Sequence, residues 1–218
     1  MAYGPPTKTV GDVMRVVKRQ FGDESGVQLE DADIAGWIND AQSRINAENK
    51  VLKAKSSSSA TPGTAVYTFP SLDIQQVESL HFAGRRVPNM TFAQAEETVS
   101  QSDPDGTLTA DEPVLWYEWG GSFTFWPTPS TAGAIDIYYT VAPTLVTTTE
   151  ADLLSLPDDY FMDVVAYVLQ QAYEMDEDWP ASQAKEQQLM NSLARRGEEQ
   201  RTAQNMTYET ITVVNDYY

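Results

Sequence analysis

The sequence predicts an α+β protein, mainly α, in which helical pairs from the two ends of the chain form a bundle and a small antiparallel β-rich domain is inserted between them. Two observations predict this layout. Apolar residues recur at helical spacing near both ends of the 218-residue chain. The middle instead holds short alternating segments that are bounded by Gly, Pro, Asp and Ser.

Four segments follow from these patterns. We expect an N-terminal helical pair over residues 1–55, a β-rich insertion over 56–150, a C-terminal helical pair over 151–200 that completes the bundle, and an extended C-terminal tail over 201–218.

The N-terminal pair carries local start and stop signals. Thr9 is suited to cap the first helix, Asp12 lies in its acidic first turn, and Gly22 is suited to end it. A second helix is predicted to begin around Asp31. The apolar stripes of the two helices consist of Val10, Val13, Met14, Val17 and Phe21, and of Ile34, Trp37, Ile38, Ala41 and Ile45.

The C-terminal pair is the segment around which the chain is organised. Pro157 and Asp158 are helix-start signals, because Asp158 can cap free backbone N–H groups. The run Asp176–Pro180 is predicted to break this helix, and a second, more polar helix is predicted to end at Gly197. The apolar positions are Phe161, Val164, Val165, Val168 and Ala172 in the first helix, and Ala184, Leu189, Met190 and Leu193 in the second.

The middle of the chain is predicted to be β-rich. Ser56–Gly63 is expected to be a flexible, low-complexity loop that separates the N-terminal helices from the strands. The clearest element is a hairpin in which Gly120-Gly121 joins two aromatic strands, Leu115–Trp119 and Ser122–Trp126. Further strands are predicted over Val66–Phe69, Val77–Phe82 and Ile135–Val141, and a short helix over Thr91–Val99.

The C-terminal end also has a strand pattern. From Tyr208 to Val214, Thr210 and Thr212 fall on one side, whereas Ile211 and Val213 fall on the other. This segment has no obvious strand partner in its own sequence neighbourhood.

The charge restricts the partners that the protein can bind. Its net charge is −18, with two basic and eleven acidic side chains over residues 56–150 and four basic and thirteen acidic over residues 151–218. Binding to phosphate backbones needs Lys and Arg to displace counterions, so the composition argues against broad nucleic-acid binding. Such a protein can nevertheless stand beside DNA without adhering to it, because like charges repel.

The chain contains no cysteine, which excludes disulfides, thiol nucleophiles and cysteine-ligated metals. Residues 1–6 lack the pattern of a signal peptide, and no apolar run approaches the length of a membrane span. We therefore expect a protein that is made and folded in cytoplasm and that has no membrane partner.

The residues that resemble a metal site do not fit one well. Gln101, Asp103, Asp105, Gly106, Leu108 and Glu112 match several positions of an EF-hand calcium loop. The first ligand position holds Gln101 in place of an aspartate, and Pro113 follows where a helix should continue. A turn between elements is the better interpretation, and Asp176–Asp178 is likewise predicted to be a solvated acidic turn. No metal or cofactor is predicted.

The remaining candidates for chemistry have structural interpretations. His81 lies in a strand pattern without a serine motif or a second histidine nearby, so a half-buried strand residue is favoured over a catalytic base. Trp116, Trp119 and Trp126 could stack on sugars, but the aromatic residues of the hairpin alternate between two faces, which favours a small sheet core. No catalytic residue is predicted.

The layout as a whole resembles the head-to-tail adaptor, or connector, proteins of tailed bacteriophages. The resemblance covers about residues 9–196 and depends on the order of its motifs. The motifs are the helix Leu29–Gln42 with Asn39-Asp40-Ala41-Gln42, the hairpin end Phe123–Pro129, the strand Ile135–Tyr139 leading to Ala142-Pro143, and Leu156-Pro157-Asp158-Asp159-Tyr160 before the long helix.

The resemblance implies a virion structural protein at the head–tail interface. Members form a ring, commonly twelvefold, that docks under the portal protein, extends the channel through which genomic DNA passes, and meets tail or nozzle proteins. It also implies that the C-terminal tail docks on the portal, here through Tyr208, Ile211, Val213, Val214, Tyr217 and Tyr218. Arg85 and Arg86, the basic residues of the β-rich middle, are candidates for an intersubunit or tail-side contact.

Two other classes of function remain open from the residues alone. One is a glycan- or protein-binding β module of a phage tail component that uses the tryptophans of the hairpin. The other is a hydrolase in which His81 belongs to a site assembled in space.

Overall fold

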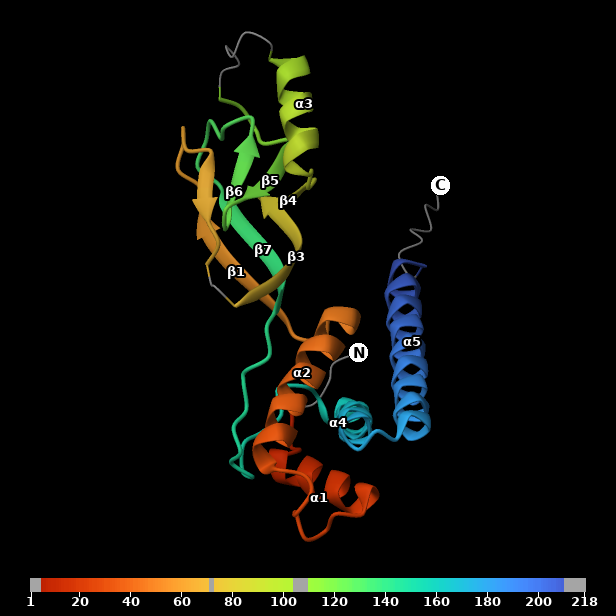
Figure 1. Ribbon diagram of the computed structural model, residues 1–218. Helices are drawn as coiled ribbons and strands as arrows, with labels where there is room; N and C mark the ends of the chain where they lie inside the picture. Colours follow the sequence, from red (N-terminus) through yellow and green to blue (C-terminus); the bar gives the residue numbers. More distant parts are fainter. Residues whose placement is uncertain (1–4, 71–72, 104–109, 210–218) are drawn as a thin grey trace, which may run out of the picture. The chain divides into compact units, whose positions relative to one another are not determined.

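The structure, a computed structural model, describes residues 5–70, 73–103 and 110–209, with side chains described through Thr202 (Figure 1). The chain divides into two compact units. The helical unit comprises Met1–Leu52 and Pro143–Tyr218, and the β unit comprises Lys53–Ala142. The described residues form five α-helices and two antiparallel sheets, so the predicted α+β class is confirmed.

The helical unit contains α1 (Val10–Phe21), α2 (Asp31–Asn49), α4 (Phe161–Met175) and α5 (Trp179–Glu209), and a 3-10 turn, η1 (Asp158–Tyr160), leads into α4. These helices share one core, in which α1, α2 and α5 each pack against α4. The fully buried side chains of this core include Val13, Ile34, Ile38, Tyr160, Val164, Leu169 and Leu189. Apolar residues at helical spacing therefore do face a shared interior.

Both predicted ends of α1 are confirmed. The Thr9 hydroxyl accepts a hydrogen bond from the Asp12 backbone N–H, and the Asp12 carboxylate accepts one from the Thr9 N–H, each at 3.2 Å. Gly22 ends the helix in the left-handed region, at φ 94°, where a residue without Cβ is favoured. Local sequence signals thus set this helix.

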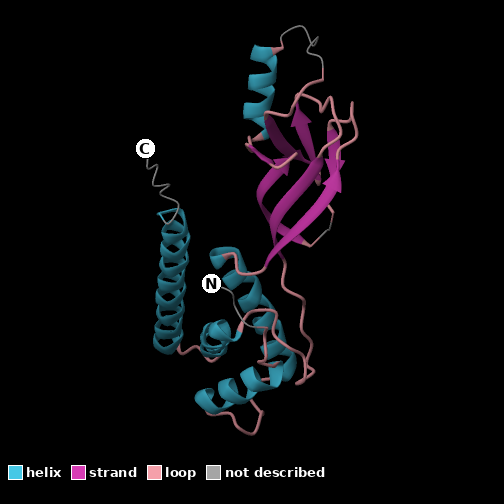
Figure 2. Ribbon diagram, turned by 180° about the vertical axis from the view of Figure 1, so that it is seen from behind, coloured by secondary structure: helices cyan, strands magenta, loops and turns pink. Residues whose placement is uncertain are grey.

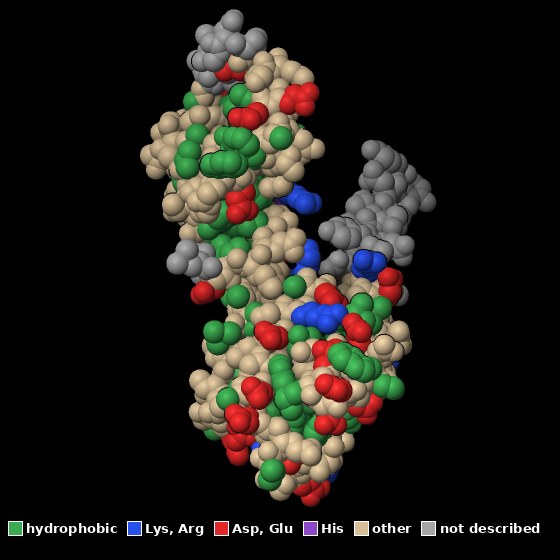
Figure 3. Space-filling view, in the orientation of Figure 1, with side chains coloured by type: hydrophobic (Ala, Val, Ile, Leu, Met, Phe, Trp, Pro, Cys, Tyr) green, Lys and Arg blue, Asp and Glu red, His purple; other side chains and the backbone are tan. Residues whose placement is uncertain are grey.

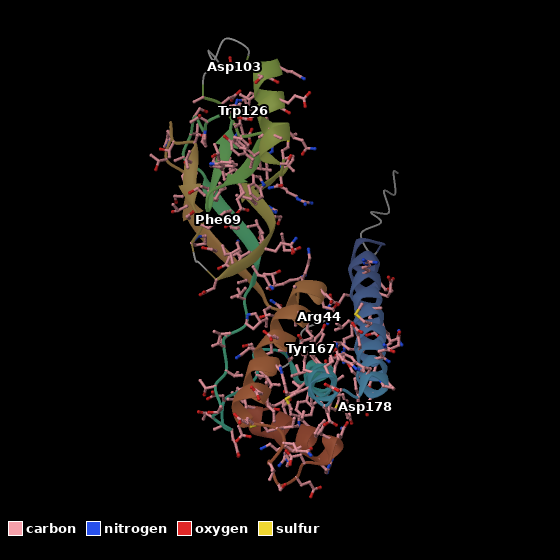
Figure 4. All side chains as sticks on the ribbon, in the orientation of Figure 1. Arg44, Phe69, Asp103, Trp126, Tyr167 and Asp178 are labelled. Carbon is pink, nitrogen blue, oxygen red and sulfur yellow. The ribbon has the colours of Figure 1, made fainter. Side chains whose placement is uncertain are left out.

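The predicted break between the C-terminal helices is also confirmed. α4 ends at Met175 and α5 begins at Trp179. Asp178, which lies at the start of α5 (Figure 4), accepts a hydrogen bond from the Ala181 backbone N–H at 3.2 Å. Its carboxylate therefore caps an end where a negative charge is favourable.

The predicted end of α5 is wrong. The helix passes through Gly197 and continues to Glu209, so residues 201–209 are helical and not an extended tail. The cause is packing beyond Gly197, because the Gln200 amide donates to the Tyr160 hydroxyl at 3.2 Å. Residues 210–218, where most of the predicted strand lies, are outside the described residues, whereas Tyr208 belongs to the helix.

The β unit contains two antiparallel sheets. The strands are β1 (Lys53–Ser59), β2 (Val66–Thr68), β3 (Ile74–Phe82), β4 (Arg85–Val87), β5 (Leu115–Trp119), β6 (Ser122–Trp126) and β7 (Ala134–Val141). The first sheet has the order β1-β7-β3-β4, and the second has the order β2-β6-β5. Figure 2 shows these strands gathered in one unit, with α3 (Phe92–Ser102) beside them.

The serine run is a strand and not the flexible loop that was predicted over Ser56–Gly63. β1 pairs with β7 over its full length, from Lys53 opposite Thr140 to Ser59 opposite Ala134. Serine has little strand preference of its own, so the pairing comes from a partner that is distant in sequence. Pro62 and Gly63, which follow β1, do form a turn.

The hairpin and α3 agree with the prediction. β5 and β6 pair around Gly120-Gly121, with Trp119 opposite Ser122. α3 has the predicted capping box, in which Thr91 and Gln94 bond reciprocally, and it packs against β5. The core of the β unit consists of Ala60, Leu80, Phe82, Val87, Trp116, Phe123, Phe125, Ile135 and Ile137.

Candidate assembly surfaces

The described residues of the segment that resembles an EF-hand loop, Gln101–Glu112, do not form a metal site. Gln101 lies in α3 and Asp103 is its C-cap, while the Glu112 carboxylate accepts two hydrogen bonds from the Arg85 guanidinium, both at 2.7 Å. Asp105, Gly106 and Leu108 lie outside the described residues. Across the described chain, no group of three or more His, Asp or Glu side chains is placed to hold a metal ion.

His81 is a half-buried residue of β3, as predicted. Its ring lies 5.1 Å from the ring of Tyr138, and its Nε2 lies 3.4 Å from the Ser79 hydroxyl. The opposite residue, Asp136, directs its carboxylate to Ser57 at 2.5 Å and to Lys55 at 3.1 Å. Since that carboxylate is engaged by other groups, this geometry does not make His81 an oriented general base.

The three tryptophans do not form a sugar-stacking surface together. Trp116 is only 3% exposed, and its indole N–H donates to the Val87 carbonyl at 3.1 Å. Trp126, which Figure 4 labels in the β unit, is half-buried. Trp119 is 65% exposed, but its ring lies 4.4 Å from that of Phe92. The expected sheet core thus accounts for Trp116, and of the three tryptophans Trp119 is the exposed one.

The two neighbouring arginines, Arg85 and Arg86, differ in their interactions. Arg85 is bound to Glu112, and this hydrogen bond raises the pKa of its guanidinium. Arg86 lies opposite His81 on β4 and is exposed. In the described part of the chain it forms no ion pair or hydrogen bond through its side chain. Of the two predicted contact residues, Arg86 is therefore the one with an uncommitted charge.

Arg86 belongs to a polar outer face of the four-stranded sheet. Ser57 of β1 lies opposite Asp136 of β7. Asp136 in turn lies opposite His81 of β3, and His81 lies opposite Arg86 of β4, so the four side chains share one face of the sheet. Hydrogen bonds from Ser57 and then Lys55 hold the pKa of Asp136 below its usual value, and the same ion pair raises the pKa of Lys55. Sequence reasoning missed Lys53 and Lys55 because the following serines were interpreted as a loop.

β1 is also a free edge of that sheet. Ala60 N–H donates to the Gly133 carbonyl at 2.8 Å, which fixes the alternation of hydrogen-bonded pairs along β1 and β7. The backbone N–H and C=O groups of Lys53, Lys55, Ser57 and Ser59 therefore point away from β7. No described residue bonds to these groups, and all four residues are exposed.

A comparison with protein families decides what kind of protein carries these surfaces. The family model for the SU10 adaptor protein matches residues 8–212. The chain belongs to the SU10 adaptor protein family. No curated protein matches it.

Membership of this phage head–tail adaptor family makes the chain a structural component of the virion that associates with head and tail parts. None of the helices that the structure describes in this adaptor combines the length and the apolar character needed to cross a membrane.

The motif residues of this adaptor connect segments that are distant in sequence. Asn39 exchanges two hydrogen bonds with the backbone of Val146, at 3.0 and 2.8 Å. Gln42 accepts from the Ser155 N–H at 2.6 Å. The piece Asn39-Asp40-Ala41-Gln42 thus fixes the chain where it returns from the β unit to the helical unit.

Asp158 has a different role from the predicted helix cap. No side chain caps the start of η1 or α4. The Asp158 carboxylate instead accepts from the backbone N–H groups of Thr7, at 2.7 Å, and Lys8, at 3.0 Å, and from the Thr7 hydroxyl. These bonds, led by that from the hydroxyl, lower the pKa of Asp158. They tie the N-terminal segment to the turn before α4.

The adaptor also holds α5 against the start of α4 through a partly buried cluster. The Arg196 guanidinium donates to the Asp163 carboxylate at 3.0 Å and lies 4.6 Å from the centre of the Tyr160 ring. Gln200 then bonds to the Tyr160 hydroxyl. Sequence reasoning missed this cluster, because the partners of Arg196 and Gln200 are distant in sequence.

Proposed function

We propose that this adaptor is a ring subunit that docks under the portal protein, extends the DNA channel and connects the capsid to the tail. The observation that carries the proposal is the family match over residues 8–212, which includes both units. The two units offer separate surfaces, as a protein that joins two different partners requires. The ring would be a homo-oligomer of about twelve copies with closed symmetry.

The portal-docking residues are proposed to be those of the C-terminal segment: Tyr208, Ile211, Val213, Val214, Tyr217 and Tyr218. Support comes from α5. Among the described side chains of this helix, Gln200 makes a hydrogen bond to the rest of the helical unit, through the Tyr160 hydroxyl, and α5 then continues through Glu209. Nine further residues (209 minus 200) of helix extend about 14 Å at 1.5 Å per residue. The helix would thereby present the segment at a distance from the core.

The charge of the chain is compatible with a DNA channel. The net charge is −18, and Figure 3 shows Asp and Glu side chains spread over the visible face of the helical unit. Like charge prevents adhesion of the DNA, so genomic DNA would pass without sequence-specific binding. Arg86, with its uncommitted charge, is proposed as the intersubunit or tail-side contact, and Arg85 would support it through its bond to Glu112.

The docking proposal can be tested with the purified chain and the purified portal protein of its phage. Mass measurement and negative-stain images of the mixture should show about twelve added copies as density on one end of the portal. The double variant Tyr217→Ala/Tyr218→Ala should weaken portal binding by about tenfold or more, because aromatic anchors carry much of the energy of an interface. The control Asn215→Ala should bind as the wild type.

Absence of any association between the wild-type chain and the portal would contradict the proposal. Equal binding by the double variant and the control would contradict only the role of the C-terminal segment.

A further inference from the structure

We propose that residues 210–216 of one copy of this adaptor add as an antiparallel strand to the free edge of β1 in a second copy. The inference rests on the proposed ring, and it names the contact that would join neighbouring subunits. It is carried by an unpaired backbone edge in the β unit and by the sequence that follows α5.

Beyond Lys53, at one end of the strand, the β1 edge lacks the usual protection against strand addition. Exposed edges are commonly blunted by Lys, Pro or bulges. Here the Lys55 ammonium is folded over the sheet, where it lies 3.1 Å from Asp136 and 5.3 Å from the centre of the Tyr138 ring. Ser56–Ser59 are small and have no proline or register shift among them. The outward N–H and C=O groups of Lys53, Lys55, Ser57 and Ser59 are thus available to a further strand.

The segment after α5 has the composition of a strand. Thr210–Val214 are five consecutive β-branched residues, without Gly or Pro, and such side chains fit best on a pleated sheet. An added strand supplies backbone hydrogen bonds for affinity, and its alternate side chains supply specificity. The segment therefore suits an edge that offers unpaired backbone groups.

One register of residues 210–216 against β1 places the apolar side chains on the core face of the sheet and a carboxylate beside a lysine. With Thr210 opposite Ser59, Thr212 falls opposite Ser57 and Asp216 opposite Lys53. Lys53 makes no ion pair with the described residues, so a carboxylate beside it is favourable. Ile211 and Val213 then lie on the side of the sheet that carries Ile135 and Ile137, which are core residues of the β unit.

A second copy is the occupant that the symmetry favours. Each chain has one free β1 edge and one C-terminal segment, so head-to-tail addition satisfies every edge when the ring closes. Tyr217 and Tyr218 lie beyond Lys53 in this register and stay available to the portal. Ile211, Val213 and Val214 cannot serve both partners at once, so in the closed ring they would contact β1 of the neighbouring copy and leave the portal contact to Tyr208, Tyr217 and Tyr218.

The absence of cysteine from the chain allows a direct test by cross-linking. A full-length Ser57→Cys variant is mixed with a differently tagged Thr212→Cys variant, and the mixture is oxidised mildly. Directly opposite residues in a sheet lie about 5.5 Å apart at Cα, within disulfide range. In an equimolar ring, about one junction in four joins a Ser57→Cys edge to a Thr212→Cys segment. We expect disulfide-linked dimers that carry both tags.

The matched control is Ser56→Cys mixed with Thr212→Cys, because Ser56 faces the other side of the sheet. Three results would overturn the inference: mixed dimers no more frequent than in this control, a monomeric chain that gives no cross-link, or an intramolecular disulfide in a single chain that carries both Ser57→Cys and Thr212→Cys. Portal binding by the wild type is measured separately, so failure of the strand pairing is distinguishable from failure of portal docking.

Discussion

Asp23 organises the connection between α1 and α2 with a single carboxylate. The residue is 4% exposed, and its carboxylate accepts hydrogen bonds from the backbone N–H groups of Val27, Gln28 and Leu29, at 2.8 to 2.9 Å. Ser25 donates a further bond at 3.2 Å. The bond from Leu29 is the main cause of a pKa lowered from 3.8 to about 2. The ionised form of Asp23 is therefore part of the folded structure.

This shift predicts how the stability of the helical unit changes with acid. Because the folded pKa is the lower one, the contribution of Asp23 is fully present above pH 3.8 and is lost as the pH falls from 3.8 towards 2. Asp23→Asn should lower the melting temperature at pH 7 and reduce its pH dependence in that window. The exposed neighbour Glu24 provides the control Glu24→Gln, which should melt as the wild type does. Identical melting of Asp23→Asn and the control between pH 2 and 7 would contradict this role.

At the scale of elements, predictions held where the signal was local. The ends of α1, the cap of α3 and the turn of the β5–β6 hairpin depend on residues within a few positions of each other, so the sequence displays them. β1 was missed because its pairing joins Ser57 to Asp136, 79 residues away. α5 was ended too early because Arg196 and Gln200 find partners at Asp163 and Tyr160, which no window around Gly197 contains.

Gly197 offers a direct test of the helix boundary. A glycine inside a helix costs about 0.5–1 kcal/mol relative to alanine, whereas alanine in a left-handed C-terminal position is strained. A Cβ at Gly197 would meet no atom within 4 Å. Gly197→Ala should therefore raise the melting temperature by about 1–4 °C. The matched variant Gly22→Ala, at φ 94°, should lower it. A lower melting temperature for Gly197→Ala would indicate that the helix ends at Gly197.

At the scale of the whole molecule, we expect stability and assembly to depend on different parts of the chain. The buried cores of both units are built from residues between Val10 and Leu193. Arg86 and the edge residues of β1 lie outside these cores, and the candidate contact residues after α5 lie outside the described residues. Composition could exclude classes of partner, but it could not find the β1 edge, because a free edge exists only once β7 has paired with the other side.

Deletion of residues 210–218 tests this separation. The truncated chain keeps all the core residues that the structure describes in both units, so its thermal transition should lie within about 2 °C of that of the full chain. Ring formation and portal binding should both be lost, because the deletion removes the proposed strand and the proposed portal contacts. Calorimetry measures the first expectation, and mass measurement with and without portal measures the second. A large fall in melting temperature would show that the segment completes the fold of its own chain, and a truncated chain that still forms rings would show that subunits join through other surfaces.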